Sequence, residues 1–316
     1  MHRFIVFFIL LLAAGAPARA FELQSQQVVP GVYALVGPKE ARSYDNYGLN
    51  ATFGFAITPT GVVLIDSGSS LAGAKIIAAA IRKITPQPVR WVINTGSQDH
   101  RWLGNGYFAG KGAEIIALKR TVDTQREVGE QWLAALKPVL KEHLDGTVPL
   151  HAAHPIAADR RAFELGGRHF ELIWLGDAHF AGDAVVWMPR EKLLFSGDLI
   201  FVERILGVLP WSHAASWRKA FHAMEGLRPE HIVPGHGHSC DLATARRDTG
   251  DYLDWLVTEV GQAVADWEPI ETAVDRLADA PKFKHLELYD MLHRSNLNRT
   301  YVELEQRELP RAAPAK

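Results

Sequence analysis

The chain of 316 residues has a globular composition, with 47% hydrophobic and 22% charged residues, which excludes a disordered chain, a collagen and a coiled coil. The formal net charge of −2 gives no basic excess, so we expect no nucleic-acid partner. The single cysteine, Cys240, excludes a disulfide within the chain and a cysteine-rich zinc site. Any bound metal must therefore be held by histidine and carboxylate side chains.

The N-terminal segment has the pattern of a signal peptide. Arg3 precedes an apolar run over residues 4–14, which is too short to cross a bilayer. Ala18 and Ala20 place small residues at the two positions that a signal peptidase reads. We expect cleavage after residue 20, a periplasmic or secreted protein that spans 21–316 as one domain, and no membrane association after cleavage. An uncleaved membrane anchor is the less favoured alternative.

Strands and helices are predicted in two similar blocks, at roughly 30–155 and 156–240. Periodicity and turn residues in the first block predict strands, a helix with one apolar face, and a long helix interrupted near its proline. These elements lie at 32–36, 52–58, 62–66, 77–84, 89–95, 114–118 and 120–143.

The second block is predicted to repeat this arrangement, with further helices after it. Its strands lie at 163–165, 170–175, 184–187, 193–195 and 231–233, and its helices near 217–227, 253–264, 270–278 and 285–304. Each block has a sheet that needs cover on both faces. The pattern therefore predicts a mixed α/β fold, a four-layer αββα sandwich of two similar halves.

Residues that suit metal binding follow four of the predicted strands. They are Asp99 and His100, His179, Asp198, and His236, and each has a glycine nearby. Strand ends at one edge of a sheet converge, so these side chains can meet, and imidazole and carboxylate are ligands that zinc accepts. One such residue alone is more often an ordinary turn residue, whereas four sites in order are a stronger signal.

These segments together resemble the metallo-β-lactamase-fold superfamily. The matching pieces are VLIDSG at 63–68, DH at 99–100, GN at 104–105, AHFAGD at 178–183, LFSGD at 194–198 and VPGHG at 233–237. The resemblance implies an αββα sandwich with a zinc site at one edge. It also implies hydrolysis of β-lactams, thioesters, lactones, phosphoesters or sulfate esters. Some periplasmic members are linked to quinoprotein oxidation systems, and the N-terminal segment is somewhat similar to that branch.

One motif departs from the family pattern, which is His-x-His-x-Asp-His. The segment here reads NTGSQDH and lacks both leading histidines. Counting back from Asp99 puts Thr95 and Ser97 in their places. Counting forward from the strand puts Gly96 and Gln98 there, in a loop that is one residue shorter. We favour the shortened loop, since it would swing both side chains away from a shared metal.

The resemblance assigns metal ligands to two sites, of which one is broken. The first keeps only His179 and Asp198, and the second keeps Asp99, His100, His236 and Asp198. Three protein ligands and an open position suffice for a catalytic zinc, so we expect one Zn²⁺ per chain.

The expected enzyme hydrolyses an ester, lactone, amide or similar bond in a small-molecule substrate. Zinc lowers the pKa of its bound water from about 15.7 to roughly 7, which supplies hydroxide at neutral pH. Asp198 or His179 would transfer the proton. The rival hypothesis is a degenerate, non-catalytic periplasmic binding protein on the same fold, tied to a quinoprotein system. Neither hypothesis predicts an oligomeric state.

Several residues outside this set have weaker signals. Asp66 is expected to orient a ligand. His213 is a candidate for substrate contact or for the start of a helix, and His238 for the rim of the site. Four polar residues of the last predicted helix face either the substrate or solvent: His293, Asn296, Arg299 and Tyr301.

Overall fold

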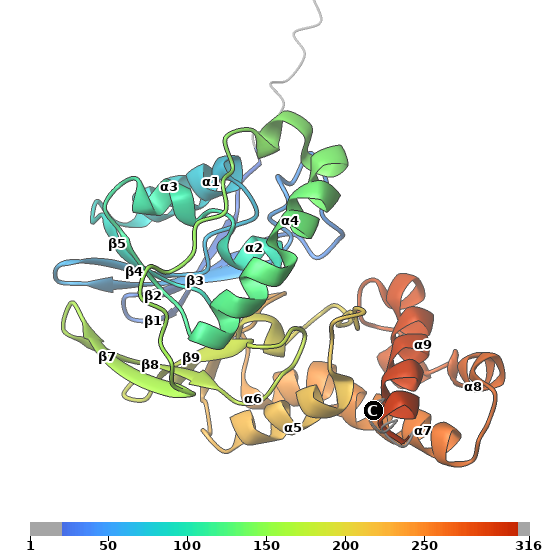
Figure 1. Cartoon of the computed structure of the whole chain (residues 1–316). Coiled ribbons are helices and arrows are strands. Elements are labelled where there is room, and N and C mark those ends of the chain that lie inside the picture. The colour runs from blue at the N-terminus through green and yellow to red at the C-terminus, as the bar shows by residue number, and fades with distance from the viewer. Residues whose placement is uncertain (1–20, 309–316) are drawn as a thin grey trace, which may run out of the picture.

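Two β-sheets face each other in the computed structural model, which describes residues 21–308, and helices cover both outer faces (Figure 1). The predicted αββα sandwich is confirmed. The expected signal peptide, residues 1–20, lies outside the described residues. Within residues 21–308, no helix is both long and apolar enough to span a membrane.

The first sheet has six strands that lie side by side in the order of the sequence. The first four pair antiparallel, and the last two join in parallel. Five strands confirm the predictions. The first was missed because its sequence, QSQQVV, is mostly polar and partly exposed at the sheet edge. The strands are β1 (Gln24–Val29), β2 (Val32–Val36), β3 (Thr52–Thr58), β4 (Gly61–Ile65), β5 (Val89–Ile93) and β6 (Glu114–Ile116).

Helices cover the outer face of this sheet (Figure 1). The first begins where the Ser70 hydroxyl accepts a hydrogen bond from the Gly73 amide at 3.0 Å. The long helix continues through Pro138 and ends two residues later, at Leu140, where a 3₁₀ turn follows, so the expected interruption lies at the end of the helix. The helices are α1 (Leu71–Ile84), α2 (Asp99–Trp102), α3 (Asn105–Ala109) and α4 (Lys119–Leu140), and the 3₁₀ turn is Lys141–Leu144.

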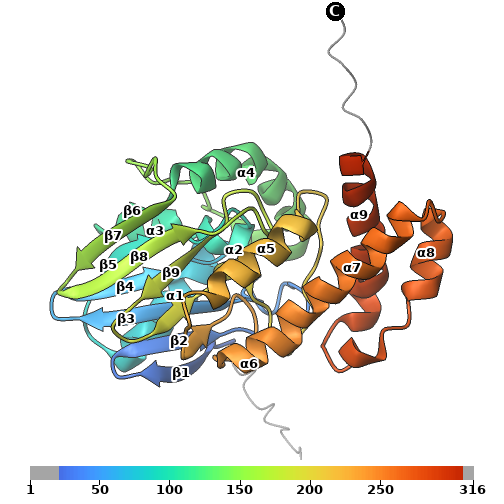
Figure 2. The ribbon, with the colours of Figure 1, turned by 90° about the horizontal axis from the view of Figure 1, so that it is seen from below.

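The second sheet has five strands in the order β11-β10-β9-β8-β7. The predicted turn at Gly166 and Gly167 is confirmed, because both have positive φ and the flanking strands pair antiparallel. Helix α5 crosses the outer face of this sheet (Figure 2). The elements are β7 (Arg160–Leu165), β8 (Arg168–Trp174), β9 (Ala184–Met188), β10 (Leu193–Phe195), β11 (His231–Val233), α5 (Ala214–Glu225) and α6 (Leu242–Ala245).

The two sheets pack closely through apolar side chains. A Cβ at Gly54 of β3 would lie 2.2 Å from the Phe195 ring of β10, so only glycine fits there. Backbone contacts also join the sheets, because the Thr52 amide donates to the Gly235 carbonyl at 2.7 Å. The edge where these strands meet is thus held in one fixed arrangement.

Three further helices stack at one end of the sandwich (Figure 2). They are α7 (Asp251–Ala265), α8 (Ile270–Leu277) and α9 (Tyr289–Glu308). Of the four polar residues of α9 selected from the sequence, His293, Asn296 and Tyr301 are buried, whereas Arg299 is partly exposed. Asn296 accepts a hydrogen bond from the Val208 amide at 2.7 Å and donates to the Leu206 carbonyl at 2.8 Å. Buried His293 hydrogen-bonds Tyr252 at 2.9 Å. These contacts hold the loop over 200–213 against the sandwich.

Candidate active site

Three of the predicted site residues converge at the ends of β5, β10 and β11. His100 lies in α2, Asp198 in the 3₁₀ turn Gly197–Leu199, and His236 directly after β11. Nε2 of His100 lies 3.3 Å from Oδ2 of Asp198, and Nε2 of His236 lies 3.2 Å from Oδ1. All three side chains are buried, and their ligand atoms lie within 4.8 Å of one another.

These three residues fit a single metal ion. Zinc bonds of about 2.0–2.2 Å in a tetrahedron put neighbouring ligand atoms roughly 3.4 Å apart, close to the two measured separations. Nδ1 of His236 lies 2.8 Å from the Asn50 carbonyl oxygen, so it must carry the ring proton. The lone pair on Nε2 therefore faces a carboxylate oxygen. Two acceptors at that distance repel each other unless a cation lies between them.

Burial keeps both imidazoles in the form that binds metal. Desolvation lowers the pKa of His100, and Arg101 lowers it further. Desolvation also lowers the pKa of His236 well below its ordinary value, with Arg204 adding to the effect. Both rings are therefore neutral near pH 7 and carry a free lone pair.

A buried arginine that the sequence analysis did not select holds the central carboxylate. Arg101 donates to Asp198 through Nη2 at 2.5 Å and Nε at 3.0 Å. It also donates to Asp66 at 3.1 Å, and to the carbonyls of Thr52 at 3.1 Å and Gly235 at 2.9 Å. Burial alone would raise the pKa of Asp198, but Arg101 holds it well below its usual range. Asp66 thus supports this guanidinium instead of contacting a candidate metal ligand.

The Asp-His pair of the motif is displaced by one residue. His100 and Arg101 reach Asp198, whereas Asp99 does not join the group of possible metal ligands. Its carboxylate instead accepts a hydrogen bond from Arg42 at 2.7 Å. The two residues of this segment that contact Asp198 are thus His100 and Arg101.

Gln98 occupies the neighbourhood expected for the second leading histidine. With its amide nitrogen toward His179, it donates to that ring at 2.9 Å and to Asp198 at 3.3 Å. Its oxygen then accepts from Arg42 at 2.9 Å. Burial lowers the pKa of His179 to about 4, although Asp198 opposes that shift. His179 is not in the metal-binding group, but it contacts the same carboxylate through Gln98.

The structure favours the register that puts Gly96 and Gln98 at the two histidine positions. Thr95 points elsewhere, because its amide and hydroxyl both donate to Asp66, at 2.8 and 2.7 Å. A Cβ at Gly96 would lie 2.8 Å from a carboxylate oxygen of Asp183, so a side chain there would require that carboxylate to move. With His100 counted as the counterpart of the family's aspartate, the spacing from Gln98 to His100 would need no deletion, whereas with Asp99 in that place the loop is one residue shorter. The shortened loop stays a prediction.

A small pocket of about 180 Å³ opens beside these residues. Six polar side chains line part of its wall, and apolar side chains line the rest. The polar residues are Arg42, Asn50, Gln98, His179, Arg204 and His236. The main apolar residues are Phe201, Leu209, Leu288, Met291 and Leu292.

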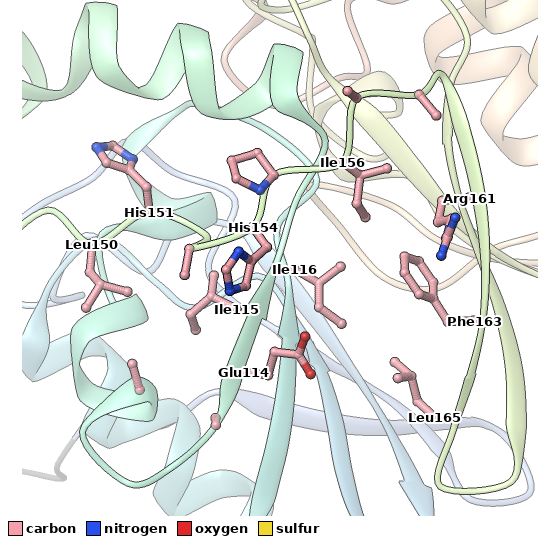
Figure 3. Close-up of a pocket in the computed structure, with 16 residues that line it drawn as sticks. Glu114, Ile115, Ile116, Leu150, His151, His154, Ile156, Arg161, Phe163 and Leu165 are labelled. Atoms are coloured by element: carbon pink, nitrogen blue, oxygen red, sulfur yellow. The ribbon is translucent and has the colours of Figure 1, made fainter.

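A larger hollow of about 670 Å³ lies at the other side of the sandwich, between the edge strands β6 and β7. Figure 3 shows Ile116 and Phe163 within it, with Glu114 and Arg161 on opposite walls. None of the five predicted site residues, all of which are described, lines this hollow. Two of those five residues, His179 and His236, line the smaller pocket instead.

Two other histidines lie outside the pocket that His236 lines. His213 directly precedes α5, so the helix-start alternative holds, and it lines a separate hollow beside α9. His238 is half-exposed and hydrogen-bonds Glu203 at 2.9 Å and Gln24 at 3.1 Å. Its ring is partly exposed to solvent.

Comparison with known proteins agrees with this arrangement. The family model described as the metallo-β-lactamase superfamily matches residues 48–236. The chain belongs to this superfamily. Among relatives, it is 25% identical over 228 residues to the 2,4-dinitroanisole O-demethylase subunit alpha of Nocardioides sp. (strain JS1661), across 72% of this chain and 63% of that protein. It is 27% identical over 194 residues to a metallo-β-lactamase type 2 of Elizabethkingia meningoseptica, across 60% of this chain and 69% of that protein.

Solved structures share the superfamily fold at lower identity. A metallo-β-lactamase from Pontibacter korlensis aligns with a TM-score of 0.60 and 21% identity, over 74% of this chain and 99% of its own. The sec-alkylsulfatase Pisa1 from Pseudomonas sp. aligns with a TM-score of 0.71 and 16% identity, over 91% of this chain and 50% of its own. This chain thus spans 63% of the O-demethylase subunit and half of the sulfatase. These likenesses support the fold and leave the reaction open.

Proposed function

We propose that the chain is a hydrolase that works with one zinc ion, held by His100, Asp198 and His236. The observation that carries this proposal is the convergence of two neutral imidazoles and one ionised carboxylate at separations that suit a single ion. The fixed positive charge of Arg101, bonded to the same carboxylate, favours one metal ion over two, since a second cation would face direct repulsion.

A zinc ion bound there would polarise the scissile group and acidify a water molecule. Around it, Arg101 keeps Asp198 ionised and fixes both carboxylate oxygens. Gln98 orients His179 on the pocket wall. Because the pKa of His179 is lowered to about 4, this ring is neutral and only weakly basic near pH 7. Asp198 is ionised under the same conditions, and its lowered pKa makes it a weak base too. Both residues therefore suit hydrogen bonding to the substrate or the attacking water better than uptake of a proton.

The substrate is proposed to be a small molecule. The pocket of about 180 Å³ is smaller than sites for drug-sized ligands, which have volumes of roughly 300–1,000 Å³. We further propose a periplasmic or secreted location from the N-terminal pattern, and no nucleic-acid partner from the net charge of −2.

A non-catalytic binding protein, tied to a quinoprotein system, is the second candidate. Arg101 favours it, because this guanidinium already neutralises Asp198 without any metal. Gly96 and Gln98 also leave the other half of the family site without imidazoles. A protein of this kind would bind its ligand with no metal and no turnover.

Metal content and turnover, measured together, separate the two candidates. Protein purified without chelator should contain one equivalent of zinc by elemental analysis. It should also hydrolyse at least one member of a panel of esters, lactones, β-lactams and sulfate esters. His236→Ala should lose both properties. His238→Ala is the matched control, because it removes an imidazole two residues away that contacts Glu203 instead of Asp198.

Two results would contradict the proposal. Two tightly bound equivalents of zinc would show that Arg101 does not exclude a second ion. Zinc-free protein that stays inactive after zinc is supplied would support the binding protein.

A further inference from the structure

Arg204 is a buried cation that lacks an anionic partner. Arg204 is only 7% exposed to solvent. Within residues 21–308, no carboxylate lies close enough to Arg204 to form an ion pair. Its Nε is buried without a hydrogen-bond partner. Its Nη1 lies 3.3 Å from Nδ1 of His236, which carries a proton toward the Asn50 carbonyl. A buried charge without a counter-charge is costly, and proteins retain such groups where a ligand completes them.

A second arginine faces the same pocket in a fixed position. Arg42 donates to Asp99 at 2.7 Å and to the Gln98 oxygen at 2.9 Å, and it lies 5.5 Å from the centre of the Trp132 ring. Asp99, which the resemblance placed on the metal, thus anchors a cation at the pocket. Two arginines that share one hollow repel each other. Burial lowers the pKa of Arg204 most and Arg42 lowers it further, while Asp198 and Glu40 oppose the shift.

No acidic side chain offsets these charges within the pocket. Among the described residues that line it, none is aspartate or glutamate. Of the nearby carboxylates, Asp99 pairs with Arg42 and Asp198 with Arg101. Asp198 and the exposed Glu40 stabilise the charge of Arg204 only from a distance, without forming an ion pair with it. The pocket therefore carries an excess of positive charge that a ligand can neutralise.

The opposite wall of the pocket is apolar. Leu288, Met291 and Leu292, at the start of α9, line it together with Leu209 and Phe201. Met291 is 63% exposed, whereas Arg204 is almost fully covered, so the apolar wall extends outward from the cationic end. One end of the pocket suits an anionic group, and the other suits a short hydrocarbon chain.

We propose that Arg204 and Arg42 bind the anionic group of a small organic oxyanion, a carboxylate or sulfate ester, whose apolar chain lies against Leu209, Met291 and Leu292. Guanidinium groups recognise such oxygens through paired, charge-assisted hydrogen bonds. The identity of this ligand as substrate rests on the proposed hydrolytic function. The binding itself does not, because it needs neither turnover nor metal.

Calorimetric titration of the mature protein, with and without prior chelation, tests this assignment. The probes are hexanoate and hexyl sulfate, with hexanol lacking the charge and acetate lacking the chain. At least one hexyl anion should bind at least tenfold more tightly than hexanol or acetate. Whether hexanoate or hexyl sulfate binds more tightly identifies the preferred head group. Arg204→Gln should weaken that binding at least tenfold, and Arg42→Gln should weaken it too. Arg218→Gln, on the exposed face of α5, removes the same charge and should not.

A stability measurement keeps the test decisive if a variant folds poorly. Because the cation is unpaired without ligand, Arg204→Met should melt at a higher temperature than the wild type and show less stabilisation by the hexyl anion. Equal binding of hexanol and the hexyl anions would overturn the assignment. The assignment would also be overturned if chelation abolished anion binding while Arg204→Gln left it intact. That result would show that the anion binds to a metal ion. Loss of turnover with retained anion binding would instead contradict only the hydrolase.

Discussion

Replacing Arg101 with methionine should strongly destabilise the fold. The guanidinium is fully buried and donates to Asp198, Asp66, and the carbonyls of Thr52 and Gly235, so it links segments of both sheets. Removing one partner of a buried ion pair costs about 3–5 kcal/mol, because the remaining charge is uncompensated. For a domain of this size, that corresponds to a fall in melting temperature of roughly 5–8 °C.

The assay is urea unfolding followed by tryptophan fluorescence, with thermal melting in parallel. Arg101→Lys should fall between the wild type and Arg101→Met, since it keeps the charge and loses the paired geometry. The double variant Arg101→Met with Asp198→Asn should recover part of the loss, because it also removes a stranded carboxylate. A loss below about 1 kcal/mol for Arg101→Met would refute the reasoning, since a buried pair broken on one side costs more.

Three further outcomes follow from individual contacts. His236→Ala should lose the bound zinc, while His179→Ala should keep it, as measured by elemental analysis. Zinc lost from His179→Ala but kept by His236→Ala would contradict the ligand assignment. Gly54→Ala should cost about 1–3 kcal/mol in urea unfolding by forcing a Cβ into the Phe195 ring, and an unchanged midpoint would show that the sheets can separate there. Burial raises the pKa of the Cys240 thiol to about 12. A disulfide reagent at pH 8 should therefore label this thiol slowly in the native protein, faster as pH rises, and rapidly once the protein unfolds. Rapid labelling of the native protein at pH 8 would contradict the raised pKa.

The sequence by itself was enough to predict the sandwich and most of its strands. Most strands are short apolar runs, and many of them end in a glycine-containing turn, which is a local signal. The same signal located His100, Asp198 and His236, because residues that follow strands of one sheet meet at one edge. The edge strand β1 escaped notice because its polar, half-exposed side chains lack that pattern.

Only the tertiary structure decided which residues of the broken motif face the site. Asp99 begins the short helix α2, and side chains in a helix turn by about 100° per residue. That rotation sends Asp99 toward Arg42 and brings the next two residues, His100 and Arg101, to Asp198. The residues of the motif alone do not show at which residue the helix begins, and therefore which side chains face the site.

The two decisive arginines were also beyond the reach of sequence patterns. Arginine is usually exposed, and its burial depends on partners distant in the chain: Arg101 binds Asp198, and Arg204 lies beside His236. Composition and periodicity give the charge of each residue, but they do not show which charged side chains are buried next to one another. Sequence therefore determined the layers of the fold and the edge that carries the site, whereas long-range packing determined the charge inside it.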